Sequence, residues 1–149
     1  MKTLRCCYLS LLMVLTGLSV HSQSPGISIT NFSACTVYFQ LIGGADPATP
    51  CTPTTFSGII QMLPSGGAVV YANPTTVPIP GLSPTNCIVG ARIYSQYPAT
   101  CPPQLPTYVI GDICTPFLQS QVYISVNLNC STSCNVTAVW TPGSTLNFY

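Results

Sequence analysis

Two stretches of the chain alternate apolar and polar residues with a period of two. In residues 27–42 one parity is apolar, and it consists of Ile27, Ile29, Cys35, Val37, Phe39 and Leu41. In residues 122–140 the even positions are apolar on both sides of Ser131-Thr132-Ser133. Successive side chains of a strand point to opposite faces, so this period predicts half-buried strands in both stretches.

The second stretch predicts a β-hairpin that is closed by a disulfide. If the chain turns at residues 131–133, Cys130 faces Cys134 and Leu128 faces Val136. Directly opposed residues have Cα atoms about 4.5 Å apart in a non-hydrogen-bonded pair, and a disulfide accepts roughly 4.4–6.8 Å. We therefore predict a Cys130–Cys134 bond. The turn lacks the glycine that three-residue hairpin loops often carry.

Shorter strand signals lie between these two stretches, over residues 58–63, 68–72, 87–94 and 108–110. Proline-rich segments separate them, over residues 45–57, 73–86 and 95–106. Proline cannot donate a ladder hydrogen bond, so these segments suit loops or sheet edges. No sustained helical period follows residue 22. About seven or eight short strands with turns between them predict an all-β, single-domain, disulfide-stapled β-sandwich.

The first 22 residues are typical of a secretory signal peptide. Lys2 and Arg5 provide a basic start, residues 9–20 are mostly apolar, and small residues precede a predicted cleavage site at Gln23. The apolar run is too short to cross a bilayer, which needs about 20 residues. We expect residues 1–22 to be removed and residues 23–149 to form a secreted domain, extracellular or at the cell surface, without a membrane span.

Removal of the signal peptide leaves very few charged side chains. Only Asp46, Arg92 and Asp112 remain, and the single histidine is lost with the signal peptide. One arginine cannot supply the many phosphate contacts of a nucleic-acid-binding protein or a polybasic membrane patch. A surface with so little charge also has weak protection against self-association. We therefore expect no nucleic-acid partner, and either self-association or an extracellular protein or glycan as partner.

Of the nine cysteines, Cys6 and Cys7 lie in the signal peptide and 9 − 2 = 7 remain. Export to an oxidising environment favours disulfides. Zinc would need histidines or paired Cys-x2-Cys motifs, which the secreted part lacks, so we expect no metal and no cofactor. Besides Cys130–Cys134 we pair Cys87 with Cys101, which bracket one strand and its following loop. The odd cysteine is either a buried, inert Cys35 or an exposed Cys51 or Cys114 that links two chains.

Asp46, Arg92 and Asp112 are the candidate ligand contacts. Both aspartates lie near glycines in predicted loops, where two carboxylates could hydrolyse a glycoside or could bond their own backbone. Arg92 shares the polar face of residues 87–94, where it either contacts a carboxylate or sugar or faces solvent. Without histidine or lysine, a serine or cysteine nucleophile has no ordinary base. We therefore expect no catalytic residue and no enzymatic activity.

Tyrosines are well suited to a recognition surface, because they add contact area with a polar tip. Seven remain after removal of the signal peptide, since Tyr8 is lost from the eight in the chain. They favour either a recognition surface or the rim of a β core. We predict a secreted, non-enzymatic interaction or structural module with a capacity to self-assemble. The alternative is a soluble carbohydrate-binding module, and a glycan hydrolase using Asp46 and Asp112 is the least favoured reading.

Three sites match the pattern for N-glycosylation, at Asn31, Asn129 and Asn135. Asn129 and Asn135 lie on the polar face of the predicted hairpin, which allows a glycan. Asn31 shares its parity with the apolar Ile29, which argues against one.

The order of a strand, Asn31, Cys35 and a second strand, followed by Pro-x-Gly and by Ala91-Arg92-Ile93 with an aromatic residue, resembles the start of thaumatin-like proteins. The resemblance covers a few short pieces. The chain lacks the cysteine density and the acidic cleft residues of that family, so no expectation about function follows from it.

Overall fold

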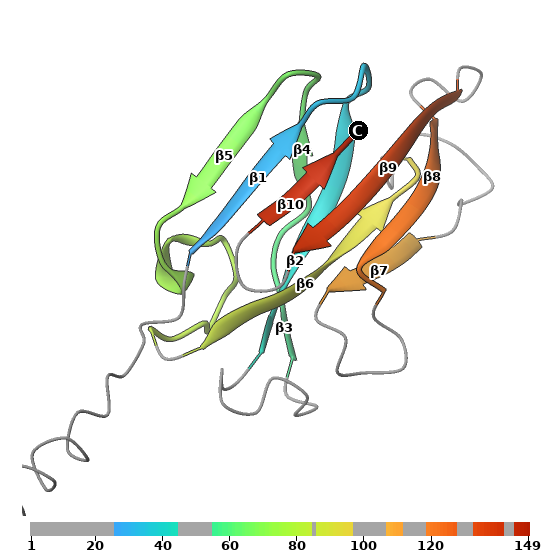
Figure 1. Cartoon of the computed structure of the whole chain (residues 1–149). Helices are drawn as coiled ribbons and strands as arrows, with labels where there is room; N and C mark the ends of the chain where they lie inside the picture. Colours follow the sequence, from blue (N-terminus) through green and yellow to red (C-terminus); the bar gives the residue numbers. More distant parts are fainter. Residues whose placement is uncertain are drawn as a thin grey trace, which may run out of the picture.

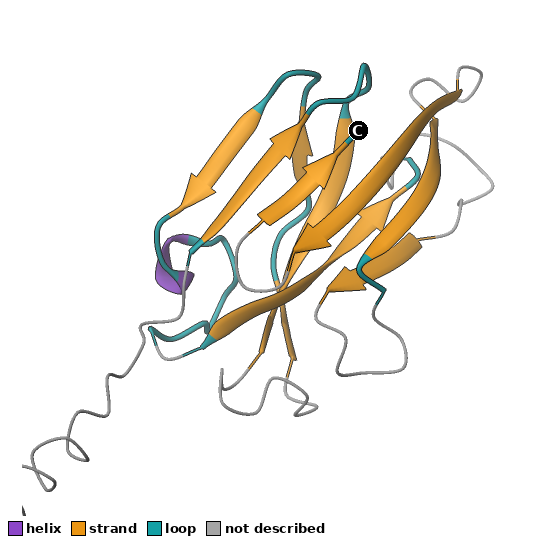
Figure 2. Cartoon of the chain, in the orientation of Figure 1, coloured by secondary structure: helices purple, strands orange, loops and turns teal. Residues whose placement is uncertain are grey.

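The structure is a computed structural model, and it describes residues 26–44, 55–84, 86–96, 107–111, 119–127, 133–141 and 145–149. These residues form two packed β-sheets and one 3-10 turn, η1 (Pro74–Thr76) (Figure 1; Figure 2). The predicted all-β sandwich is therefore confirmed. The signal peptide predicted for residues 1–22 lies outside the described residues.

We call the two sheets A and B. Sheet A has the strand order β5 (Ala68–Tyr71), β1 (Ile27–Asn31), β10 (Thr145–Phe148), β9 (Ser133–Thr141) and β8 (Gln121–Asn127). Sheet B has the order β3 (Thr55–Ser57), β2 (Val37–Gly44), β6 (Cys87–Tyr94) and β7 (Thr107–Gly111), and β4 (Gln61–Leu63) also pairs with β2. All of these pairs are antiparallel except β1 with β10. In Figure 1, β1, β10 and β9 lie in front of β2 and β6.

The stretch 27–42 is divided between the two sheets. β1 ends at Asn31 in sheet A, and β2 begins at Val37 in sheet B. The apolar parity nevertheless continues from one strand to the next, because both strands face the same interior from opposite sides. A second difference from the sequence-based prediction is β3, which lies within residues 45–57, a segment predicted to be a loop.

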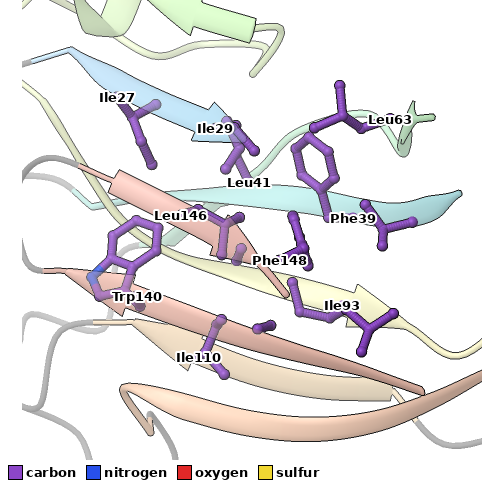
Figure 3. Packing of buried hydrophobic residues seen from close by; sticks show 14 of the residues in the cluster. Ile27, Ile29, Phe39, Leu41, Leu63, Ile93, Ile110, Trp140, Leu146 and Phe148 are labelled. Carbon is purple, nitrogen blue, oxygen red and sulfur yellow. The ribbon is translucent and has the colours of Figure 1, made fainter. Parts of the chain in front are cut away.

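The apolar parities of the strands meet between the two sheets and form the core. Ile29 of sheet A and Leu41 and Ile93 of sheet B are completely buried, and Figure 3 shows them among the side chains that fill this space. The rings of Phe39 and Phe148 join the two sheets with 5.9 Å between their centroids. Burying one such side chain contributes about 1.5–3 kcal/mol. This packing fixes which side chains each sheet presents on its outer face.

Connections between the sheets lie at both edges of the sandwich. At one edge, β4 of sheet B continues through residues 64–67 into β5 of sheet A. Gly66 in this corner has a φ of 71°, a left-handed conformation that glycine adopts at little cost. At the other edge, the backbone N–H of Gly111 in β7 donates to the carbonyl of Gln119, just before β8, over 2.9 Å. Backbone bonds therefore connect β7 of sheet B to the start of β8 in sheet A.

The hairpin of β8 and β9 exists, but its register differs from the predicted one. Val126 faces Cys134, whereas the predicted pairing of Leu128 with Val136 continues to Val126 opposite Ala138. On β9 the observed partner of each β8 residue lies four positions before the predicted one. Four is an even number, so the same side chains still point inward. The predicted inward face is therefore right and the predicted partners are wrong.

A disulfide joins Cys35, just before β2, to Cys134 in β9, with 6.1 Å between the Cα atoms. Because Cys134 is bonded to Cys35, the predicted Cys130–Cys134 bond is wrong. Cys35 is buried, as its parity indicated, but it is not the unpaired cysteine. Cys87 lies half-buried at the start of β6, and Cys101 lies outside the described residues, so the Cys87–Cys101 bond remains a prediction.

Candidate functional site

The outer face of sheet B gathers polar and aromatic side chains from neighbouring strands. Tyr38 and Gln40 of β2 point away from the core, since they alternate with buried residues. Tyr38 pairs with Met62 on one side and Tyr94 on the other, while Gln40 pairs with Arg92, and Arg92 in turn pairs with Val109. We call this surface the recognition face, and it consists of Tyr38, Gln40, Met62, Arg92, Tyr94 and Val109. The strands that carry it, β4, β2, β6 and β7, can be followed in Figure 1.

A β-bulge helps to set the orientation of the side chains on β6. The pairing of β2 with β6 shifts between Ile42 and Gly43. Both Ile88 and Val89 are buried next to this shift, whereas regular alternation would expose one of them. From Ala91 onward buried and half-buried positions alternate, and the outward positions Arg92 and Tyr94 belong to the recognition face. A bulge is a common way to redirect side chains near a functional surface.

Gln40 holds two neighbouring side chains in place. Its Nε2 donates to the carbonyl of Gly58 over 2.6 Å. Its Oε1 accepts from Nη1 of Arg92 over 3.2 Å and from Oη of Tyr94 over 3.0 Å. A flipped amide would turn Nε2 toward the donors of Arg92 and Tyr94 and Oε1 toward the carbonyl of Gly58. Only one orientation of the amide therefore forms all three bonds. The positions of the guanidinium and the phenol are therefore coupled through one anchored amide.

Arg92 is half-buried and is the one charged side chain within the described ranges. A guanidinium has five N–H donors in a planar fork, and the bond to Gln40 uses one of them. No aspartate or glutamate stands among the described residues to pair with it. The prediction that Arg92 points away from Ala91 and Ile93 is confirmed by the burial of those two residues on the other face.

The two aspartates predicted as ligand contacts, Asp46 and Asp112, lie outside the described residues. β2 and β7, the strands before these aspartates in the sequence, both pair antiparallel with β6 and finish at the same end of sheet B. There Gly44 of β2 pairs with Cys87, and Gly111 of β7 pairs with Gly90. Because the structure describes neither aspartate, their role as ligand contacts remains a prediction.

The tyrosines divide between the recognition face and other positions. Tyr71 packs against the core and donates its hydroxyl to Gln61 over 2.5 Å. Tyr108 also packs against the core from β7. Tyr123 is exposed on the outer face of sheet A, and Tyr149 stacks on Phe32 with 5.4 Å between ring centroids. The described tyrosines therefore lie both at the rim of the core and on the outer surface, and a recognition role for them stays a prediction.

Gln40 and Met62 belong to the recognition face but were not singled out from the sequence. Gln40 does lie on the polar parity of residues 27–42, next to Tyr38. The alternation of residues 27–42 shows that the Gln40 side chain points away from the core. It does not show the hydrogen bonds to Arg92 and Tyr94, because these residues are more than fifty positions away in the chain. Pairing between β2 and β6 brings them together, and alternation alone does not specify this pairing.

Comparison with protein families, curated proteins and solved structures finds no match for this chain. Within the described ranges, no group of three or more His, Cys, Asp or Glu residues could hold a metal ion. Those ranges also contain no helix that is long and apolar enough to cross a membrane. Fold and site together define a disulfide-bonded β-sandwich that presents an ordered polar and aromatic face on one sheet.

Proposed function

We propose that the protein is a non-enzymatic, extracellular interaction module that recognises its ligand through the recognition face of sheet B. The observation that carries this proposal is the anchoring of Arg92 and Tyr94 by Gln40 on an outer sheet face. Side chains that are already held in position lose less conformational entropy when a ligand binds. The signal-like N-terminus and the Cys35–Cys134 bond support an extracellular location, where disulfides persist.

The chemistry of the recognition face is suited to binding. The guanidinium of Arg92 offers N–H donors and no acceptor. Gln40 has no titratable group, and its amide is occupied by three neighbours. These groups can donate hydrogen bonds, supply one positive charge and offer aromatic contact area, which are the elements of a specific but modest interaction.

Binding by the intact secreted protein tests this proposal. Wild-type protein is applied to an array of extracellular polysaccharides and matrix proteins, together with the variants Gln40→Ala and Tyr94→Ala. We expect both variants to lose about tenfold or more in affinity, because each removes a contact that holds the face together. The control is Tyr123→Ala, which changes an exposed tyrosine on sheet A. Equal loss in the control, or binding that neither recognition-face variant weakens, would contradict the proposal.

Self-association is a second candidate function, and a separate observation favours it. Three large apolar side chains are exposed within four consecutive positions: Ile59 is 59% exposed, Ile60 37% and Met62 64%. We call these three residues the apolar edge. They lie in and beside β4, a strand at the margin of sheet B. Clustered exposed apolar residues commonly mark a protein contact.

A further inference from the structure

The recognition face carries one positive charge, and no negative side chain accompanies it in the described part of the chain. We propose that the ligand of this face is an acidic polysaccharide, and that Arg92 recognises a carboxylate on its sugar rings. This inference rests on the proposed function and names its ligand class.

The environment of Arg92 is suited to a carboxylate. The hydrogen bond from Nη1 to Gln40 leaves four of the five N–H donors for other acceptors. Gln40 is itself tied to the carbonyl of Gly58, so the guanidinium is held from one side. A planar guanidinium can meet both oxygens of a carboxylate at once, which a point charge such as an ammonium cannot do.

A single positive charge, with no other charged side chain among the described residues, favours a sugar polymer over a nucleic acid or an acidic peptide. Nucleic acids carry charges so closely spaced that binding depends on many cationic contacts, and a run of acidic residues poses the same demand. A uronate polymer carries at most one carboxylate on each sugar ring, and most of its other polar groups are hydroxyl groups. Tyr38 and Tyr94 stand directly opposite each other beside Arg92, and their rings and hydroxyls can contact the apolar and polar parts of a sugar.

A single charge also predicts how the interaction responds to salt. An ion pair at a protein surface is screened over a Debye length of about 8 Å at physiological ionic strength. Affinity should therefore fall when salt is raised, but only modestly, because the neutral contacts remain.

The test compares charged and neutral forms of the same sugars. Oligomers of galacturonate, alginate and hyaluronan, each with its neutral ester, are titrated into disulfide-bonded secreted protein and followed by calorimetry and NMR. We expect at least one acid to bind about tenfold more tightly than its ester. The variant Arg92→Gln should bind the acid as weakly as the ester, Arg92→Lys should recover only part of the difference, and Tyr123→Ser on sheet A should behave as wild type.

Several outcomes would overturn the inference. Equal binding of acid and ester would show that the carboxylate is not read, yet the proposed recognition function would stand if Gln40→Ala still weakens both. Tighter binding of a polyglutamate peptide would assign the anion to a peptide ligand, and tighter binding of dextran sulfate would replace the carboxylate by a sulfate group. Failure of all the oligomers to bind would remove the sugar inference, whereas the proposed function would fail only if its own array also gave no binding.

Discussion

Asn31 is completely buried, and its polar side chain is bonded on all sides. Its Nδ2 donates to the carbonyls of Cys35, Leu63 and Pro64 over 2.6, 3.0 and 3.0 Å. Its Oδ1 accepts from the backbone N–H and the hydroxyl of Ser33. One side chain therefore ties the connection between β1 and β2 to the corner between β4 and β5. This burial also explains why the glycosylation pattern at Asn31 cannot hold a glycan in the folded protein.

Replacement of Asn31 by alanine should be strongly destabilising. The change leaves three carbonyls without this donor in or near the core, and one buried unsatisfied group typically costs about 1–3 kcal/mol. We expect the free energy of unfolding in denaturant to fall by about 2 kcal/mol or more. The control is Asn135→Ala, an exposed asparagine on β9, for which a change within about 0.5 kcal/mol is expected. A similarly small loss for Asn31→Ala would contradict the central role of this network.

Tyr71 predicts how stability changes at alkaline pH. Burial raises the pKa of Tyr71 above its ordinary value of 10.0, and the hydrogen bond to Gln61 opposes part of that effect. The folded state thus prefers the neutral phenol, and the resulting stability is fully present below the unfolded pKa and is lost as pH rises through the folded pKa. Unfolding midpoints between pH 8 and pH 11 should fall less steeply for Tyr71→Phe than for wild type. Tyr123→Phe should retain the wild-type slope, and an equal slope in both variants would show that Tyr71 is not responsible.

At this scale, sequence alternation predicts direction well and partnership poorly. The parity of residues 27–42 placed Asn31 inside, and the parity of residues 87–94 placed Arg92 outside, and both are confirmed. Gln40 was not singled out, because its three bonding partners come from other parts of the chain. A side chain's direction depends on its own strand, whereas its hydrogen bonds depend on which strands become neighbours.

The same distinction holds for whole elements. The strand at residues 87–94 was predicted with the bounds that β6 shows. The division of residues 27–42 between two sheets was not predicted, because the buried parity is the same whether one strand continues or two strands face one interior. The register of β8 and β9 was also wrong, since an even shift leaves every inward side chain inward. Contacts between distant segments, including the Cys35–Cys134 bond, resolve what the local pattern leaves open.

The Cys35–Cys134 bond should be a large contributor to stability because it closes a long segment of chain. Its cysteines are separated by 99 positions, and the chain-entropy model gives about 4.7 kcal/mol for a loop of about 100 residues. We expect the double variant Cys35→Ala/Cys134→Ala to unfold at much lower denaturant concentration than wild type. Peptide mapping of the wild-type protein under non-reducing conditions provides the control. A peptide that links Cys134 to Cys130 would contradict the observed pairing.

At the scale of the whole molecule, the sequence predicted the class of fold. It did not predict the order of the strands in the two sheets. Short strands, proline-rich connections and the absence of helical periodicity were sufficient for an all-β sandwich. The parallel contact of β1 with β10 and the pairing of β5 with β1 join distant parts of the chain. Such contacts leave no local signal, because any strand with one apolar face can occupy several places in a sheet. The recognition face depends on this topology, and this is why only Arg92 of its members was proposed as a ligand contact from sequence.

The low charge of the described part and the apolar edge together predict weak self-association. Few charges repel one copy from another, and Ile59 and Met62 offer apolar area at the margin of sheet B. We expect the sedimentation coefficient of wild-type protein to rise with concentration under non-reducing conditions, while a non-reducing denaturing gel shows single chains. The variant Ile59→Ser/Met62→Gln should remain monomeric, while Val70→Thr, which changes a residue that is 69% exposed on sheet A, should associate as wild type. A covalent dimer on the non-reducing gel would instead assign the contact to an intermolecular disulfide, and a monomer at every concentration would exclude the apolar edge as an interface.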